Sequence, residues 1–273
     1  MKTEPKISVI TACYNHGRFI HEMLESVFNQ TFEDYEIIIV NDGSTDNSAE
    51  ILNSIVHEKV KIIHTENHGP AIARNTAIEH AKASIIMNLD ADDKIAPSLL
   101  KKAYTIFCSN LNTGIVHCDA ECFGAKSGKF EIGEHSLESM LYDNRINSQS
   151  FFRKEDWKLV GGYSAELIYG LEDWDFWLLI IELGREVVKI PETLVCYRTY
   201  KDQAECRSGR RKRDRRKMME SQLQVFHRHE KLYSTCPGAL EHFIKLEKIK
   251  NENITVRIAK SILYRFRQKY FSK

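Results

Sequence analysis

The first part of the chain alternates short apolar runs with segments of helical periodicity. Four runs have the length of β-strands, and three segments between them repeat apolar residues every three or four positions. The strand-like runs are Ile7–Ala12, Glu36–Val40, Val60–His64 and Ser84–Leu89. This alternation predicts an α/β protein with a Rossmann-like, mostly parallel sheet and helices on both faces.

Each helical segment carries a local signal of its own. Phe19, Met23 and Val27 share one face of the first segment, and the capping residues of "DGSTDNS" precede the second. The third segment is expected from about Pro70 to Ala83, with the proline in the first turn, where it is tolerated.

The pattern is weaker beyond residue 100. We expect a strand at 115–118, an irregular stretch to about Asn144 and a helix in "IYGLEDWDFWLLIIELG". The segment "EVVKIPETLVCYRTY" predicts two short strands around Pro191. Trp174 and Trp177 are expected in the core.

Composition narrows the class of protein. The 273 residues are 42% hydrophobic, enough for one large α/β domain with a tail or for two small domains. No apolar run approaches the roughly 20 residues that span a bilayer, and the N-terminus lacks the apolar stretch of a signal peptide. Seven scattered cysteines favour reduced thiols. These features predict a cytoplasmic protein.

Charge divides the chain near residue 200. Residues 201–273 hold 20 Lys and Arg against 8 Asp and Glu, a net charge of +12, and residues 1–200 carry −11. We therefore expect a catalytic-type domain over 1–200 and a basic, helical C-terminal extension over 201–273.

The basic extension has two candidate roles. Arg207–Lys217 holds eight basic residues, and apolar residues from Ile254 to Phe266 form a stripe among further basic ones. Such a helix can lie on an anionic membrane surface, which would place the protein peripherally on the inner face of the membrane. The alternative is a helix packed on the domain. Nucleic-acid binding is not predicted, because no recognition motif accompanies the charge.

Polar loops follow all four predicted strands. Open sheets bind ligands outside the carboxyl ends of their strands, so these loops would meet at one site. The sequence contains no G-x-G-x-x-G after the first strand and no G-x-x-x-x-G-K-[ST]. A dinucleotide oxidoreductase and a P-loop NTPase are therefore not expected.

The fourth strand ends in "LDADD". Asp90 and Asp92 supply hard oxygen ligands two positions apart, suited to Mg²⁺ or Mn²⁺ that also coordinates phosphate oxygens. A diphosphate leaving group needs such a cation, because charge develops on it as the bond breaks. A lone D-x-D is also common in ordinary solvated loops.

Several motifs together resemble the family 2 glycosyltransferases, including those of bacterial surface polysaccharides. They are "VITACYNHGRFIHEMLESVFNQTFEDYEIIIVNDGSTDNS", "NHGPAIARN", "LDADD", "VGGY" and "LEDWDFWL", over about residues 5–200. The resemblance implies a GT-A fold, a nucleotide-diphosphate sugar donor with UDP as the first candidate, a divalent metal and inversion at the anomeric carbon. It also implies that residues 1–118 bind a nucleotide and residues 119–200 an acceptor.

The resemblance also assigns donor-binding residues. Thr11 and Tyr14 would flank the nucleobase, and Asp42 would accept a hydrogen bond from its imide N–H. Arg74 would lie near the base or the diphosphate, and His68 would contact the donor. Alternatives from the residues alone are a turn at Asp42 and a solvated helix face at Arg74.

Four carboxylates complete the implied site. Asp90 would face the ribose and support the metal, and Asp92 would hold the metal ion. Asp173 would be the general base that deprotonates the acceptor hydroxyl, with Glu172 beside it. At a helix start the last two would also stabilise the helix dipole whatever their chemistry.

The chain departs from the family pattern after "YR". Many relatives carry a histidine there, and here Thr199 and Tyr200 follow Arg198. Arg198 or Tyr200 is a candidate to replace it.

The predicted function is transfer of a sugar to a hydroxyl of a glycan or lipid-linked acceptor in cell-surface polysaccharide synthesis. The alternatives are a non-catalytic sugar-nucleotide or glycan-binding module and a sugar-1-phosphate nucleotidyltransferase.

Overall fold

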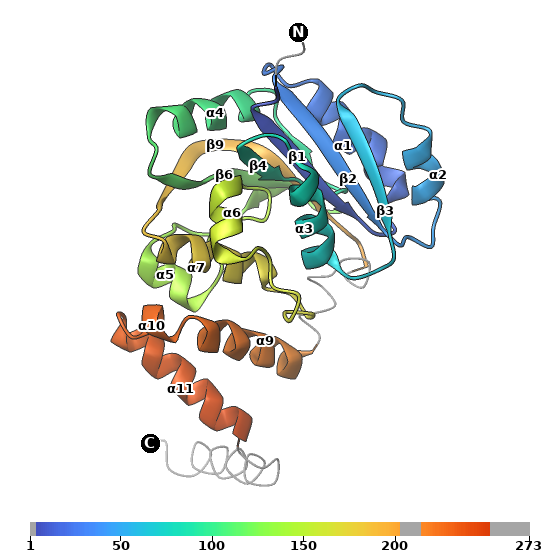
Figure 1. The fold of residues 1–273 in the computed structure, drawn as a ribbon. Coiled ribbons are helices and arrows are strands. Elements are labelled where there is room, and N and C mark those ends of the chain that lie inside the picture. Colours follow the sequence, from blue (N-terminus) through green and yellow to red (C-terminus); the bar gives the residue numbers. More distant parts are fainter. Residues whose placement is uncertain (1–3, 203–213, 252–273) are drawn as a thin grey trace.

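The computed structural model describes residues 4–202 and 214–251. One sheet of nine strands runs through it, in the order β3-β2-β1-β4-β8-β6-β9-β5, with β7 paired to β6. Figure 1 shows this sheet flanked by helices, with the last helices below it. The strands are β1 (Ile7–Cys13), β2 (Tyr35–Asp42), β3 (Val60–Thr65), β4 (Ile85–Asn88), β5 (Lys94–Ile95), β6 (Thr113–Gly124), β7 (Gly128–Phe130), β8 (Phe151–Arg153) and β9 (Glu186–Thr199).

The helices of the domain alternate with these strands. They are α1 (Gly17–Phe28), α2 (Ser48–Asn53), α3 (Pro70–His80), α4 (Leu99–Ser109), α5 (Leu137–Tyr142), α6 (Lys154–Val160) and α7 (Glu172–Glu182). Among the residues described beyond 202, the helices are α9 (Arg215–Arg228), α10 (Glu230–Tyr233) and α11 (Pro237–Asn251). The prediction of an α/β GT-A-type architecture is confirmed.

The four predicted strands of the N-terminal half form a parallel sheet, as expected. β1 pairs with β2 and β4, and β2 with β3, all in parallel. The register places Cys13 beside Asn41, so the loops after β1 and β2 leave the sheet side by side. This is why residues distant in the sequence meet at one edge.

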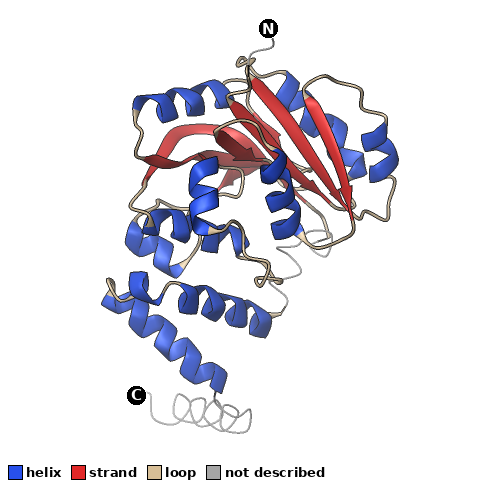
Figure 2. Ribbon diagram, in the orientation of Figure 1, coloured by secondary structure: helices blue, strands red, loops and turns tan. Residues whose placement is uncertain are grey.

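Two apolar layers hold the sheet between them. Ile37 and Ile39 of β2 belong to the layer with α1 and α4, and Ile38 and Val40 to the layer with α3 and α7. Successive side chains of a strand point to opposite faces, so a continuous apolar run serves both layers. Figure 2 shows helices on the two sides of the red strands. Trp174 lies fully buried, as predicted.

The second half differs from expectation at β9. The predicted pair of short strands is wrong: Glu186–Thr199 is one strand, parallel to β6. Its register shifts around Pro191, with Ile190 opposite Cys118 and Thr193 opposite Asp119. A proline lacks the N–H that a ladder needs, and a bulge lets the strand continue past it.

Three smaller differences concern element ends. The helix expected to run to Ala83 ends at His80. The strand expected at 115–118 extends over Thr113–Gly124. The stretch to Asn144, which showed little pattern, contains β7 and α5. Long-range pairing, rather than local periodicity, forms these strands.

The C-terminal helices pack on one another through an aromatic cluster, and they also contact α5 and α7. Phe226 stacks on Phe243 with ring centroids 5.3 Å apart, and Tyr233 meets both rings edge to face. A packed helical extension is therefore present over 214–251. Most of Arg207–Lys217 and the apolar stripe at 254–266 lie outside the described residues. No helix of the described chain is long and apolar enough to cross a membrane.

Candidate active site

A cavity of about 900 Å³ lies at the carboxyl ends of the parallel strands. The loops after β1, β2, β3 and β4 form one side of it. Residues 143–149, the start of α7 and the first turn of α9 form the other. The cavity therefore joins the predicted nucleotide-binding half to the rest of the chain.

The loop after β1 is tied to the loop after β2. Asn15 has a φ of 58°, and its side-chain oxygen accepts hydrogen bonds from the backbone N–H groups of Thr45 and Asp46. Asparagine tolerates this left-handed conformation better than most residues. Tyr14 is thereby presented to the cavity with 44% of its surface exposed. A ligand in the cavity could therefore reach the Tyr14 side chain, which was predicted to flank a nucleobase.

Thr11 and His68 do not line the cavity. Thr11 is fully buried in β1, and its hydroxyl has no hydrogen-bond partner among the described residues. His68 has an exposed side chain and meets the site through its backbone N–H, which donates to Oδ1 of Asp42 at 2.8 Å.

Asp42 lies at the end of β2 and lines the cavity, although it is only 3% exposed. Its Oδ2 accepts the N–H of Gly69 at 2.9 Å. Gly69 has a φ of 88°, which favours glycine, and it precedes α3. These bonds fix the carboxylate, and each oxygen retains a second lone pair for a ligand donor.

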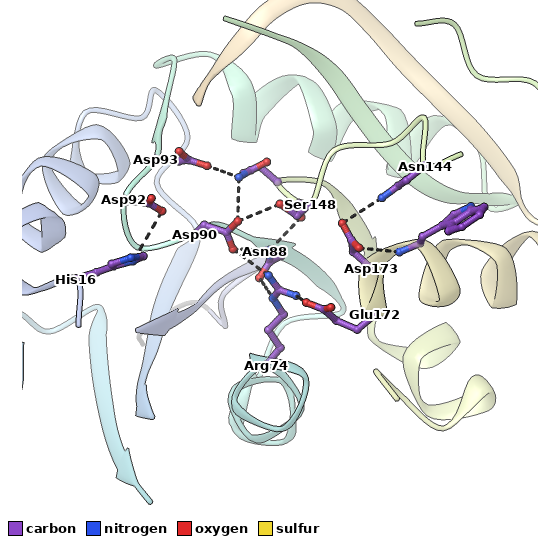
Figure 3. A network of polar contacts seen from close by, with 12 residues as sticks. His16, Arg74, Asn88, Asp90, Asp92, Asp93, Asn144, Ser148, Glu172 and Asp173 are labelled. Atoms are coloured by element: carbon purple, nitrogen blue, oxygen red, sulfur yellow. Dashed lines mark hydrogen bonds and ion pairs between the residues drawn. The ribbon is translucent and has the colours of Figure 1, made fainter. Parts of the chain in front are cut away.

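Arg74 is the centre of the largest polar network, drawn in Figure 3. Its guanidinium donates to Asn88 at 3.1 Å, to Glu172 at 2.8 Å and to Asp90 at 3.0 Å. Burial by itself would lower the pKa of Arg74, but Asp90 and Glu172 raise it, so the residue stays charged. The residues alone left a solvated helix face as an alternative, and that alternative is wrong because Arg74 is only 6% exposed.

Four side chains surround the carboxylate of Asp90. Oδ1 accepts from Arg74 at 3.0 Å and from Asn88 at 3.4 Å, and Oδ2 accepts from Ser148 at 3.0 Å and Gln149 at 3.1 Å. A carboxylate has about four lone-pair sites, so these donors use its capacity. This arrangement favours a positioning role for Asp90 over direct metal ligation.

Asp92 lies at the cavity wall beside two residues. Tyr200 donates its hydroxyl hydrogen to Oδ2, and Nδ1 of His16 lies 3.9 Å from Oδ1. Burial raises the pKa of Asp92, His16 opposes the rise, and Asp90 adds to it. Tyr200, the predicted candidate to replace the family's histidine, therefore contacts the acidic loop directly.

The third acid of the loop, Asp93, is structural. It is 1% exposed, accepts the backbone N–H of Arg198 at 2.7 Å and is hydrogen-bonded to Gln149. Burial, together with the charges of Asp92 and Asp90, raises its pKa well above the usual range. The Arg198 guanidinium reaches the backbone oxygen of Asp92 at 2.8 Å. The residues after "YR" thus brace the acidic loop.

The side chains of the cavity could hold a cation only if a bound ligand supplied further coordinating atoms. Among residues 4–202 and 214–251, no three His, Cys, Asp or Glu side chains are grouped to hold a metal ion alone. Mg²⁺ commonly binds one or two carboxylates and takes its other ligands from substrate phosphates and water. Asp92, at the wall of a cavity large enough for a nucleotide, suits this mode.

Asp173 and Glu172 occupy the first turn of α7. Oδ2 of Asp173 accepts from Asn144 at 3.1 Å, and Oδ1 accepts the N–H of Trp174 at 2.9 Å. The residue before them, Leu171, has a φ of 75°, an uncommon conformation for leucine. This strained turn aims both carboxyl groups at the cavity, which both line.

The structure adds site residues that the sequence did not single out. Asn144 holds Asp173, and Ser148 and Gln149 hold Asp90. They come from the stretch with little pattern, and no local motif marks them. His16 follows the "CYN" motif and lies at the wall, so its position after the first strand was a usable signal.

The sequence agrees with a known family over most of the domain. The model of the family described as "Glycosyl transferase family 2" matches residues 8–163, more than half of the chain. The chain belongs to glycosyl transferase family 2. The motifs of the sequence predicted this membership.

A curated relative of this family 2 glycosyltransferase is the chondroitin synthase of Pasteurella multocida (strain Pm70). The two are 29% identical over 190 residues, which is 66% of this chain and 19% of the synthase. The chain spans less than half the length of several curated glycosyltransferases that it matches.

Two solved structures have similar folds. TarS 1–349 of S. aureus in complex with UDP gives a TM-score of 0.63 at 19% identity, over 81% of this glycosyltransferase and 64% of TarS. The mannosyltransferase PcManGT of Pyrobaculum calidifontis, in complex with GDP-Man and Mn²⁺, gives 0.63 at 18% identity, over 98% and 81%. At these identities the likeness concerns the fold.

Proposed function

We propose that this glycosyltransferase is an inverting, metal-dependent enzyme that moves a sugar from a nucleotide diphosphate to an acceptor hydroxyl. The observation that carries the proposal is that Asp92 and Asp173 line one cavity and lie on either side of the Arg74 and Asp90 network in Figure 3. A donor with its diphosphate at Asp92 would leave its sugar facing Asp173. UDP is the first candidate nucleotide, supported by the family resemblance and by the UDP complex of the similar fold of TarS.

In this proposal the donor half of the cavity binds and orients the nucleotide. Asp42 accepts the imide N–H of the base, and Tyr14 packs against the ring. Asp92 holds Mg²⁺ or Mn²⁺ with the diphosphate oxygens, and the Mn²⁺ complex of PcManGT supports this choice of ion. When bound, the metal neutralises charge on the leaving diphosphate. Asp90 keeps the acidic loop in place through its four hydrogen bonds.

The transfer itself needs one base and one displacement. Asp173 accepts the proton of the acceptor hydroxyl as its oxygen attacks the anomeric carbon. The bond between that carbon and the diphosphate oxygen breaks, and the electron pair leaves with the nucleoside diphosphate. Attack opposite the leaving group inverts the configuration. Asn144 holds the base, and Arg74 holds Glu172 beside it.

Calorimetry with UDP, GDP, CMP and dTDP, each with and without Mn²⁺, tests the proposal. We expect one nucleoside diphosphate to bind in a metal-dependent manner and Asp92→Asn to lose the metal dependence. Asp143→Asn, another carboxylate of the cavity wall, is the matched control and should retain it. Failure of all four nucleotides to bind would contradict the proposal.

The acceptor and the cellular site remain predictions from the sequence. A glycan or lipid-linked acceptor in cell-surface polysaccharide synthesis agrees with the similarity to a chondroitin synthase. Contact of the basic extension with an anionic membrane concerns residues that the structure describes only in part.

A further inference from the structure

The first turn of α9 lines the cavity together with the loop before α7. Asp214, Lys217 and Met218 contribute from α9, and Ile168 and Tyr169 from the loop. The basic extension is thus part of the cavity wall, on the side that holds Asp173. This position gives the extension a role in the site that its charge did not suggest.

Tyr169 and Lys217 form one unit on this wall. The Lys217 Nζ lies 4.6 Å from the centroid of the Tyr169 ring and 3.7 Å from Oδ2 of Asp214. Asp214 also caps α9 by accepting the N–H of Lys217 at 3.1 Å. Tyr169 keeps 43% of its surface exposed and Ile168 keeps 75%, so an apolar face is open to a ligand.

A buried ionic cluster fixes α9 on the helix that carries Asp173. Asp175 of α7 is fully buried and accepts from Arg228 at 2.6 Å and from His229 at 3.1 Å. The other ring nitrogen of His229 lies 3.1 Å from Glu182, also on α7. Because α7 and α9 are joined in this way, the wall made by Lys217 keeps a fixed distance from the base.

The charges of this wall do not favour an anion. The described residues that line it include four carboxylates and two cations, namely Glu131, Asp143, Asp173, Asp214, Arg145 and Lys217. Each cation already has an acid beside it, at 4.0 Å for Arg145 and Asp143 and at 3.7 Å for Lys217 and Asp214. Toward these described residues a negatively charged acceptor would meet net repulsion, whereas hydroxyl groups can donate to their carboxylates.

We propose that this wall is the acceptor subsite, and that it takes an uncharged pyranose of the acceptor with its C–H face on Tyr169. The negative face of an aromatic ring attracts the weakly positive C–H groups of a sugar. Lys217 and Asp214 hydrogen-bond the ring hydroxyls and select the orientation. The inference rests on the proposed transferase function, since only a transferase needs an acceptor here.

Saturation-transfer NMR on the full chain, with UDP and Mn²⁺ present, tests this subsite. The probes are methyl β-D-glucopyranoside, methyl β-D-galactopyranoside, methyl α-D-mannopyranoside, methyl N-acetyl-β-D-glucosaminide and, as the charged counterpart, methyl β-D-glucuronopyranoside. We expect saturation of the C–H face of at least one uncharged glycoside and about tenfold weaker binding in Tyr169→Ala, with Tyr169→Phe close to wild type. Phe28→Ala is the matched control, an aromatic residue of similar exposure that does not line the cavity, and should leave glycoside binding unchanged.

Several outcomes would overturn the proposal. They are equal or stronger binding of the glucuronide, no loss in Tyr169→Ala, or no binding of any uncharged glycoside by protein that binds a nucleoside diphosphate. A second series of probes, the corresponding octyl glycosides, distinguishes recognition of the sugar itself from recognition of a lipid chain attached to it. Saturation of the sugar protons in both series supports the subsite, and saturation of the octyl chain alone contradicts it. Loss of nucleotide binding would instead contradict the proposed function.

Discussion

The two sides of the cavity are built from different kinds of sequence. On the donor side, four strand–loop units in succession each deliver their polar residues to the same edge. On the acceptor side, the segment 143–149, the start of α7 and the first turn of α9 come together from distant places in the chain. A repeated local pattern specifies the first side, and long-range packing specifies the second. Substitutions on the two sides should therefore differ in their effects on activity and on stability.

The largest expected effect is the loss of the base on the acceptor side. Replacing Asp173 by asparagine keeps its size and its contact with Asn144 but removes the proton acceptor. We expect kcat to fall about 10³-fold, within the usual range for general base catalysis, with nucleotide affinity unchanged. Steady-state kinetics and nucleotide calorimetry on the same preparation measure both. A variant within tenfold of wild type would remove Asp173 from this role.

The next effect concerns the link between the two sides. Arg74 bridges Asp90 of the donor side and Glu172 of the acceptor side. Arg74 and Glu172 are 98 positions apart in the sequence. Arg74→Leu leaves both acids without this partner in a buried place, and breaking such a pair costs about 3–5 kcal/mol of unfolding free energy. Urea denaturation measures the loss. Arg145→Leu, a partly exposed arginine of the same cavity, should change stability by about 1 kcal/mol or less.

The sequence indicated which loops meet at the proposed donor side for a physical reason. Asp42 and Asp92 each follow a strand whose apolar run fixes its place in the sheet, so position along the chain gives position at the edge. Arg74 was predicted to lie near the base or the diphosphate of the ligand. In the structure its guanidinium donates hydrogen bonds to Glu172, Asp90 and Asn88. That partnership depends on the packing of α7 against α3, which no local pattern encodes.

The acceptor side was less predictable for the same reason. The acids of "LEDWD" were singled out because they lie in a motif that resembles the family, and Asn144 was missed because no motif includes it. The charge run near residue 207 suggested a separate tail, whereas Asp214 and Lys217 line the cavity. A run of charged residues shows the composition of a segment but not the partners of its side chains. The contact of Arg228 with Asp175 is seen only in the folded chain.

A third, smaller effect tests whether the C-terminal helices belong to the acceptor side. Asp175→Asn weakens charge-assisted bonds to Arg228 and His229, which should cost about 2–3 kcal/mol of unfolding free energy. Asp156 is a matched control, because it is equally buried and bonds Arg185 at 2.6 Å. Both variants should lose similar stability in urea. Only Asp175→Asn should raise the acceptor KM, and equal KM changes in the two variants would contradict a role for α9.

The smallest expected effect is a dependence of stability on pH that arises in the second half of the chain. His117 of β6 is 3% exposed and lies 3.1 Å from a ring nitrogen of His135, in the segment between β7 and α5. Burial, then His135 and Lys189, lower the pKa of His117 to about 3, and Asp119 opposes them. His135, Lys189 and Asp119 are the titratable and charged groups that act on the His117 ring.

The sign of this effect follows from proton uptake. Unfolding returns the pKa of His117 to about 6.5, so between about pH 6.5 and 3 the unfolded chain binds a proton that the folded chain does not. The contribution of His117 to stability is complete above pH 6.5 and is lost as the pH falls toward 3. At pH 5 the loss amounts to about 2 kcal/mol. Urea denaturation at pH 7.5 and pH 5 of wild type and His117→Gln isolates it, since every other titrating group is common to both. Equal pH dependence in the two proteins would show that His117 takes up no additional proton on unfolding, and the acid sensitivity of the fold would then have to arise at other groups.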